Sequence, residues 1–240
     1  MKDRSRLAYQ LFAMLVGLAL GFNTAFSVAA DPIQPISRDD PETMLKQATS
    51  QLLAISSAAR EYADTDRERY YREVSAVLDQ VMDIQYFARG VMATYASSRL
   101  YKSLKTDQEK EAFRDRVEKF AKALKRVWMV KYADALLRAD GETIDIERQA
   151  TGSDNPDRAS IKQTVHDREG NTYLIQYSLH KVKDGGWLIT NVIVEGVNLG
   201  ETYRSQFAEA VEKHGGDVDY VVDHWVELML HSDEPAPAAS

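Results

Sequence analysis

The sequence predicts an α+β fold in which helices pack on a curved, four-stranded antiparallel sheet. Apolar residues recur at helical spacing through the first half of the chain. Residues 142–194 instead alternate apolar and polar side chains, as strands do, and helical periodicity returns at 203–214 and 218–230. Helices that are segregated in sequence from a run of strands favour helices packed on one face of an antiparallel sheet.

Capping sequences mark where the first helices begin. Asp40-Pro41 places an N-cap before a proline at the first helical position. Thr65-Asp66-Arg67-Glu68 and Thr106-Asp107-Gln108-Glu109 are capping boxes, and the second opens the longest predicted helix. Asp83 is expected to cap the next helix, IQYFARGVMATY. The apolar stripe of the longest helix consists of Phe113, Val117, Phe120, Leu124, Val127, Trp128, Tyr132 and Leu136.

Four strands follow in the second half of the chain, at 142–149, 158–166, 171–180 and from 187 onward. The turn Asp184-Gly185-Gly186 predicts a hairpin between the last two. Strict alternation in the last strand predicts two opposite faces. Val192 and Val194 share one face, and the other carries Trp187, Ile189, Asn191 and Ile193.

The chain begins with a segment typical of a secretory signal peptide. Lys2, Arg4 and Arg6 precede a mostly apolar stretch at 7–26, and the small residues before Asp31 predict cleavage after Ala30. The alternative is a retained membrane anchor. The tail at 232–240 is rich in proline and alanine and is expected to be disordered. A single domain at 31–231 is therefore expected between the two.

Charge and cysteine content exclude several classes of function. The net charge of −7 becomes −9 once residues 1–30 are removed. This charge, together with export, disfavours nucleic acid as a partner and electrostatic adsorption to an anionic membrane face. The chain contains no cysteine, so it forms no disulfide and carries no lipid on an N-terminal cysteine. The product is expected to be an exported periplasmic protein.

The sequence offers no catalytic signature. His224, Glu227 and His231 fall on one face of the last predicted helix, but a solvated helix face explains them better than a metal site with three ligands. Four carboxylates are the candidates for glycoside chemistry, and their polar strand and loop positions favour a solvated surface. They are Asp145, Glu147, Asp154 and Asp157.

Aromatic residues are concentrated in the long helix, the sheet and the helix that follows it. A long aromatic helix against a curved sheet fits an ordinary filled core and also an apolar cavity, and composition does not separate the two. The residues are Trp128, Tyr132, Tyr173, Tyr177, Trp187, Tyr203 and Phe207.

One long stretch resembles the signature of a known family. WLITNVIVEGVNLGETYRSQF, residues 187–207, joins a tryptophan, an apolar strand, Glu195-Gly196 and the segment Tyr203-Arg204-Ser205-Gln206-Phe207. Two further stretches, LDQVMDIQYFARGVM (78–92) and the helix at 101–136, occur in the same order as in that family. The chain thus resembles the MlaC, or toluene-tolerance, family of periplasmic phospholipid-binding proteins over most of residues 42–230. The resemblance implies a lipid cavity in a fold that is NTF2-like in appearance.

The resemblance also implies a function and partners. It implies a carrier in the Mla pathway of Gram-negative bacteria that moves glycerophospholipid between the two membranes and supports outer-membrane lipid asymmetry. The implied partners are an inner-membrane complex of an MCE-domain protein with an ABC transporter and an outer-membrane lipoprotein–porin complex. Such a carrier is not an enzyme and needs no cofactor, since the bound phospholipid is its cargo. A lipid-free periplasmic interaction module or chaperone of the same fold is the alternative.

A set of lipid-binding residues follows as a hypothesis from this resemblance and the periodicity. The face of Val192 and Val194 is favoured over the opposite face, because Asn191 fits poorly beside acyl chains. Arg204 is the candidate for a phosphate or cavity-mouth contact, and a structural salt bridge explains it equally well. The full set is Val127, Trp128, Tyr132, Leu136, Tyr177, Leu188, Val192, Val194, Tyr203, Arg204 and Phe207.

Overall fold

The computed structural model describes residues 33–138, 143–150, 155–167, 170–183 and 185–231. Within these residues, six helical segments precede the strands: α2 (Pro41–Ala59), α3 (Arg67–Val81), α4 (Ile84–Met92), η1 (Ala93–Ala96), α5 (Ser98–Ser103) and α6 (Asp107–Arg138). The strands and final helices are β1 (Thr143–Gln149), β2 (Arg158–His166), β3 (Thr172–Lys181), β4 (Trp187–Val194), β5 (Val197–Asn198), α7 (Leu199–Lys213) and α8 (Val218–His231). The predicted signal peptide and tail lie outside the described residues.

The elements form two compact units, each built from two separate stretches of chain. Unit 1 combines the chain up to Asp83 with Tyr132–Leu199, and unit 2 combines Ile84–Lys131 with the chain from Gly200 onward. Helix α6 is continuous through residue 131, so its first part belongs to unit 2 and its last turns belong to unit 1. No helix in the described part of the chain is both long and apolar enough to cross a bilayer.

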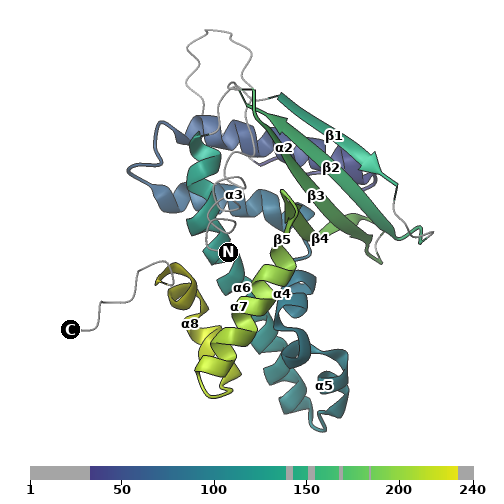
Figure 1. Ribbon diagram of the computed structural model, residues 1–240, viewed down its shortest axis with the longest axis vertical. Helices are drawn as coiled ribbons and strands as arrows, with labels where there is room; N and C mark the ends of the chain where they lie inside the picture. Colours follow the sequence, from purple (N-terminus) through teal and green to yellow (C-terminus); the bar gives the residue numbers. More distant parts are fainter. Residues whose placement is uncertain (1–32, 139–142, 151–154, 168–169, 184, 232–240) are drawn as a thin grey trace. The chain divides into compact units, whose positions relative to one another are not determined.

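Unit 1 contains an antiparallel sheet in the order β1-β2-β3-β4-β5 (Figure 1). The prediction of an α+β fold is confirmed, although the sheet has five strands and not four. The additional strand β5 has two residues and pairs with the end of β4 across the tight turn at Glu195-Gly196. The predicted β3–β4 hairpin is also confirmed, with Val182 N donating to Gly186 O at 2.8 Å, while its Asp184 lies outside the described residues.

Helices α2 and α3 run side by side against the sheet of unit 1 (Figure 1). Asp40 caps α2 as predicted, because its carboxylate accepts a hydrogen bond from Thr43 N at 2.8 Å and Pro41 occupies the first helical position. The apolar faces of the two helices are buried, as amphipathic helices on a sheet require. The residues on these faces include Met44, Leu45, Ala48, Val74, Val77 and Val81.

The predicted capping box at residues 65–68 is wrong by one residue. The N-cap of α3 is Asp66, whose carboxylate accepts from Arg69 N at 3.0 Å. The hydroxyl of Thr65 instead donates to the carbonyl of Tyr62 in the preceding turn. Threonine and aspartate are both favourable N-cap residues. The helix uses Asp66, because the preceding turn extends to that residue, where Asp66 N donates to Tyr62 O. The second capping box is confirmed, since Thr106 Oγ1 accepts from Glu109 N and the Glu109 carboxylate accepts from Thr106 N at 2.9 Å.

Strand β4 departs from the predicted alternation because it contains a β-bulge. Leu179 pairs with Ile189 and Ser178 pairs with Asn191, so Thr190 is an extra residue opposite β3. An extra residue reverses the alternation of side chains beyond it. Trp187 and Ile189 therefore share a face with Val192 and Val194, and the prediction that they lie on the opposite face is wrong. Leu188 lies on that opposite face, so it does not share a face with the two valines as predicted.

Unit 2 is helical and contains α4, η1, α5, the first part of α6, α7 and α8. Helix α4 begins directly after Asp83. Two ion pairs join α6 to α8: Arg116 contacts Asp219 through two hydrogen bonds at 2.5 and 2.8 Å, and Lys119 contacts Asp223. A bidentate pair of this kind fixes the relative orientation of the two helices more firmly than a single contact.

Candidate functional site

One face of the sheet in unit 1 is almost entirely apolar, and we call it the inner face. Cross-strand partners lie on the same face of a sheet, so the register defines its members. Most of them are less than 9% exposed, while Tyr173 and Tyr177 are half-buried and Lys181, at the end of β3, is exposed. On the three central strands they are Ala159, Ile161, Gln163, Val165, Tyr173, Ile175, Tyr177, Leu179, Lys181, Trp187, Ile189, Val192 and Val194. Three of the predicted lipid-binding residues, Tyr177, Val192 and Val194, are thus brought together.

Gln163 is a polar residue in the middle of the inner face, and it is only 1% exposed. Its side-chain carbonyl accepts a hydrogen bond of 2.8 Å from the hydroxyl of Tyr177 on the neighbouring strand. Burial raises the pKa of Tyr177, so the hydroxyl stays protonated and acts as the donor. The predicted lipid-binding set omits Gln163. Its place in the alternating pattern of 158–166 is the signal that puts it on this face.

The last turns of α6 bring Tyr132 and Leu136 into unit 1. Tyr132 is buried and Leu136 is half-buried. The same turns are held to α3, because the buried hydroxyl of Tyr70 donates to the carbonyl of Ala133 at 2.8 Å and contacts Ser56 Oγ at 3.2 Å. Burial raises the pKa of Tyr70 to about 12, so this network stays neutral over the physiological range. The helix end is therefore positioned by a buried polar contact as well as by packing.

In unit 2, seven aromatic rings form a continuous aromatic cluster. Its members are Phe87, Tyr95, Phe120, Trp128, Tyr203, Phe207 and Trp225. Trp128 packs edge-on against Phe87 at 4.9 Å and lies 6.2 Å from Tyr203, measured between ring centroids. Phe120, Phe207 and Trp225 are within 4.8 to 5.6 Å of one another. Three more of the predicted residues, Trp128, Tyr203 and Phe207, are therefore brought together, and the fully buried Val127 lies beside them in α6.

The aromatic cluster extends beyond the predicted residues. Phe87 and Trp225 were not among them, because α4 and α8 join the cluster only through tertiary packing. The indole N–H groups of Trp128 and Trp225 are buried and have no hydrogen-bond partner among the described residues. Edge-to-face ring packing is the main specific interaction that remains to them.

Arg204 is exposed and donates from Nε to the carbonyl of Gly90 at 2.9 Å. This carbonyl lies in the last turn of α4, where backbone carbonyls lack a partner within the helix. A cation at this position also interacts favourably with the helix dipole. This hydrogen bond of Arg204 is therefore a helix C-terminal contact within unit 2.

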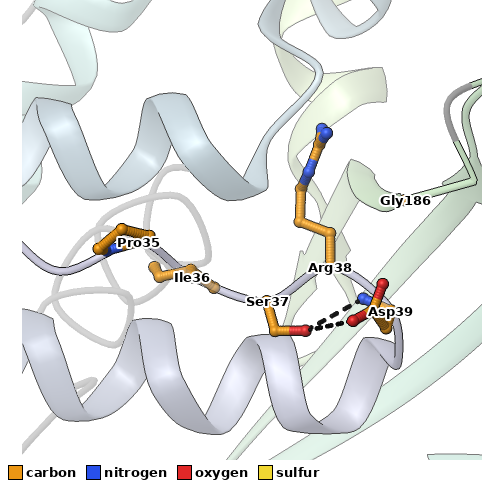
Figure 2. A pocket seen from close by; sticks show the side chains of 6 residues that line it. All are labelled: Pro35, Ile36, Ser37, Arg38, Asp39 and Gly186. Carbon is orange, nitrogen blue, oxygen red and sulfur yellow. Dashed lines mark hydrogen bonds between the residues drawn. The ribbon is translucent and has the colours of Figure 1, made fainter.

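A shallow pocket of about 460 Å³ lies in unit 1 beside the segment that precedes α2 (Figure 2). It is lined by Pro35, Ile36, Ser37, Arg38, Asp39 and Gly186. Its polar groups are engaged by the protein: Ser37 Oγ donates to the Asp39 carboxylate at 3.0 Å, and Ser37 N donates to Gln47 Oε1 at 2.8 Å. The pocket is thus a groove beside a segment that is hydrogen-bonded to α2. The residues that line it do not form a catalytic arrangement.

The candidate catalytic and metal residues do not assemble into a site in the described part of the chain. Asp145 and Glu147 contact the basic partners His166 and Lys162 on β2 at 3.4 and 2.8 Å. His224 contacts the carbonyl of Tyr220 one turn earlier in α8. Among the described residues, no three His, Cys, Asp or Glu side chains converge as a metal site. Asp154 and the side chain of His231 lie outside those residues.

Comparison with known proteins agrees with the fold. The sequence profile described as MlaC protein matches residues 46–227. The toluene tolerance protein ttg2D of Pseudomonas putida is 27% identical over 209 residues, which cover 87% of this chain and 90% of that protein. A phospholipid-binding protein from Ralstonia solanacearum, solved in complex with a phospholipid, superposes with a TM-score of 0.61 at 20% identity, covering 81% of this chain and 99% of that one.

The fold defines the class of protein. This is an α+β protein whose five-stranded antiparallel sheet and helices match a solved phospholipid-binding fold. The match of the family profile to 182 consecutive residues then identifies the family. The chain belongs to the MlaC family, as the signature around residues 187–207 predicts.

Proposed function

We propose that this protein is a periplasmic phospholipid carrier that holds its cargo by the acyl chains. The observation that carries the proposal is its likeness, over almost the full length of the other chain, to a protein solved with a phospholipid bound. The inner face of the sheet supports it, because a wall of buried Val, Ile and Leu side chains suits acyl chains. We propose a binding role and no enzymatic one, as membership of the MlaC family implies.

The physical requirement for such a carrier is enclosure of the chains. A diacyl phospholipid has about 30 methylene groups, and at about 0.8 kcal/mol each their exposure to water costs about 20–25 kcal/mol. A protein that takes lipid between membranes must therefore cover both chains, whereas the charged headgroup is best left in water. The scarcity of charged side chains on the inner face, in a chain of net charge −7, fits this division.

Tyr177 is half-buried, whereas most residues of the inner face are buried. It is therefore one of the points at which this apolar face is accessible, and burial of its hydroxyl raises its pKa. We place the acyl chains in unit 1, in contact with Tyr132, Leu136, Tyr177, Val192 and Val194. Val127, Trp128, Tyr203 and Phe207 belong to unit 2, and their predicted contact with lipid is a separate proposal for that unit.

Leu188 is left out of the proposed acyl-chain lining, and Arg204 is assigned a different contact. Leu188 is half-buried on the face opposite the two valines, so it does not line the inner face. Arg204 donates from Nε to Gly90 O, and this hydrogen bond does not use its terminal guanidinium nitrogens. We propose a headgroup contact for those nitrogens.

The expected partners are an inner-membrane MCE-domain and ABC transporter complex and an outer-membrane lipoprotein–porin complex, between which the carrier maintains outer-membrane lipid asymmetry.

The test is to express the full chain in a Gram-negative host, purify it from the periplasmic fraction and analyse its organic extract by mass spectrometry. The carrier hypothesis expects a near-stoichiometric phospholipid and a mature N-terminus at Asp31. Protein that contains no lipid and takes up none from phosphatidylglycerol vesicles would support the alternative of a lipid-free interaction module or chaperone. Recovery only in the membrane fraction would show a retained anchor.

A further inference from the structure

The segment that precedes α2 is bound to unit 1 mainly through its backbone. We call residues 34–38 the N-terminal segment; they belong to no helix or strand, and Figure 2 shows them extended beside a helix. Glutamine side chains of α2 and α3 make four hydrogen bonds to this backbone: Ile36 N donates to Gln80 Oε1 at 2.9 Å, Ser37 N donates to Gln47 Oε1 at 2.8 Å, and Gln34 O accepts from Gln51 Nε2 at 2.9 Å and from Gln80 Nε2 at 3.3 Å. The amide of Gln80 thus bridges the backbone of residues 34 and 36 and binds an extended chain without reading its side chains.

The same segment also pairs with the edge of β4. Trp187 N donates to Arg38 O at 2.8 Å. Other parts of the chain cover the rest of this edge, since Asp83 N donates to Ile189 O at 2.9 Å and β5 pairs with the last two residues of β4. A strand edge is a template for any chain that offers backbone donors and acceptors. The N-terminal segment therefore occupies one end of such an edge.

Side chains contribute little to this contact. Ile36 is the buried side chain of the segment, at 8% exposure, whereas Gln34 and Pro35 are exposed and Ser37 and Arg38 are half-buried. The binding surface consists of the three glutamine amides and the start of β4, and we call it the amide surface. It holds a backbone and one aliphatic side chain, so it does not determine which polypeptide supplies them.

The amide surface offers more than the N-terminal segment takes. Gln51 Oε1 is buried and has no hydrogen-bond partner among the described residues. A buried acceptor without a donor is costly. The shallow pocket of about 460 Å³ lies beside the segment, lined by residues 35–39 and Gly186 (Figure 2). An acceptor and a volume are thus left for a different occupant.

We propose that the amide surface is a docking site for an extended segment of a partner protein, and that the N-terminal segment is its resident occupant in the free protein. The partner segment has an aliphatic residue at the position of Ile36 and no charge at the contacting positions, because the surface binds with neutral amides and a backbone N–H. A second copy of this chain fits less well, since its identical segment would leave Gln51 Oε1 unfilled again. The resident segment can leave without breaking a helix or strand. This interaction surface goes beyond lipid binding and does not rest on it.

The experiment titrates the full chain with fluorescein-labelled peptides and follows their anisotropy. The first peptide is IQPIS, the sequence of residues 33–37, and the second is AAAIA, which keeps only the isoleucine. Ile36→Asp is expected to release the resident segment, because a carboxylate is disfavoured at that buried position. This variant should bind both peptides about 10-fold more tightly than wild type, in which the tethered segment competes at an effective concentration of about 1–10 mM.

Further variants show whether the peptide binds at the amide surface. Adding Gln80→Ala to Ile36→Asp should weaken binding about 10-fold, the scale of two lost hydrogen bonds. Gln85→Ala is the matched control, since Gln85 is an exposed glutamine of α4 in unit 2, and it should leave the affinity unchanged. The peptide IQPDS, with aspartate at the position of Ile36, should not bind.

Hydrogen exchange of the wild type keeps the test decisive if Ile36→Asp does not fold. The amide hydrogens of Ile36 and Ser37 should exchange faster when AAAIA is added above about 10 mM, because the displaced segment loses its glutamine acceptors. Exchange in α2 should not change.

The outcomes divide clearly. Folded Ile36→Asp that binds neither peptide would overturn the proposal, as would binding that Gln80→Ala leaves intact or that Gln85→Ala weakens equally. Unchanged exchange at Ile36 and Ser37 would overturn it in the wild type. A wild-type dimer in light scattering that Gln80→Ala dissociates would assign the surface to a second copy and overturn the assignment to a partner protein.

Discussion

Two consecutive residues with left-handed backbone conformations make the turn between β4 and β5. Glu195 has a φ of 49° and Gly196 a φ of 78°, the pattern of a type I′ hairpin turn. Glycine adopts this conformation without strain, whereas glutamate does so at a cost. The side chain of Glu195 offsets that cost, because its carboxylate accepts a hydrogen bond from Leu174 N while its own N–H donates to Leu174 O at 2.9 Å. The Glu-Gly pair of the family signature thus has a structural role in joining β5 to the sheet.

Substitution of Gly196 and Gly90 by alanine is predicted to have opposite effects on stability. At Gly196 an added Cβ meets no atom within 4 Å, so Gly196→Ala is strained through its positive φ alone and should lower the free energy of unfolding by about 1–2 kcal/mol. Gly90 in α4 also has no atom within 4 Å of an added Cβ, and Gly90→Ala should raise it by about 0.5–1 kcal/mol. Urea unfolding measures both. Equal effects of the two substitutions would contradict the left-handed turn.

At the scale of single elements, the start of α2 depends on an ionised side chain. The backbone hydrogen bond from Thr43 holds the pKa of Asp40 below its usual value of 3.8. A carboxyl whose pKa is lowered on folding stabilises the protein above its unfolded pKa, and this contribution is lost as the pH falls through the folded pKa. Since Asp40 is largely exposed, the contribution is small and is screened by solvent and salt.

Two substitutions at Asp40 separate the cap from its charge. Asp40→Ala should lower the free energy of unfolding by about 1 kcal/mol at pH 7, since alanine accepts no hydrogen bond from Thr43 N. Asp40→Asn keeps an acceptor and should cost less. The advantage of wild type over Asp40→Asn should be constant above pH 3.8 and shrink below it. Chemical denaturation at a series of pH values measures this difference, and an advantage that grows on acidification would contradict the assignment.

The bulge in β4 decides which face of that strand carries the proposed lipid contacts. Val192 is 5% exposed on the inner face, and its neighbour Ile193 is half-buried on the other. Val192→Asp should eliminate co-purifying phospholipid, because a carboxylate on the acyl-chain surface is strongly disfavoured. Ile193→Asp is the matched control and should retain lipid. Mass spectrometry of extracts from folded protein, checked by circular dichroism, reports both. Lipid lost from Ile193→Asp and kept in Val192→Asp would place the cargo on the opposite face.

These elements also show how far local sequence determines the structure. The caps at Asp40 and at Thr106 with Glu109 were predictable, because each rests on contacts within four residues. The bulge at Thr190 was not, since it depends on how β4 pairs with β3, and alternation in a single strand contains no such information. The same limit applies to the site. Val192 and Val194 were placed together correctly, whereas the Gln163–Tyr177 contact requires the register between β2 and β3.

At the scale of the whole molecule, neither unit is a continuous stretch of chain. The backbone passes between the units after residues 83, 131 and 199, and the middle passage lies inside the uninterrupted helix α6. Breaking α6 at residue 131 would cost its backbone hydrogen bonds there, so unfolding of one unit disturbs an element of the other. We propose on this ground that residues 31–231 behave as one cooperative domain.

The tryptophans allow this proposal to be tested, because Trp187 belongs to unit 1 while Trp128 and Trp225 belong to unit 2. All three are at most 6% exposed, so unfolding should change the fluorescence of each. A variant with Trp128→Phe and Trp225→Phe reports unit 1 alone, and Trp187→Phe reports unit 2 alone. In urea, the fluorescence midpoint of each variant should coincide with its own circular dichroism midpoint, the signature of two-state unfolding. A fluorescence transition that separates from the circular dichroism transition in either variant would instead show two units that unfold independently, and α6 would then break near residue 131 before the remaining helices are lost.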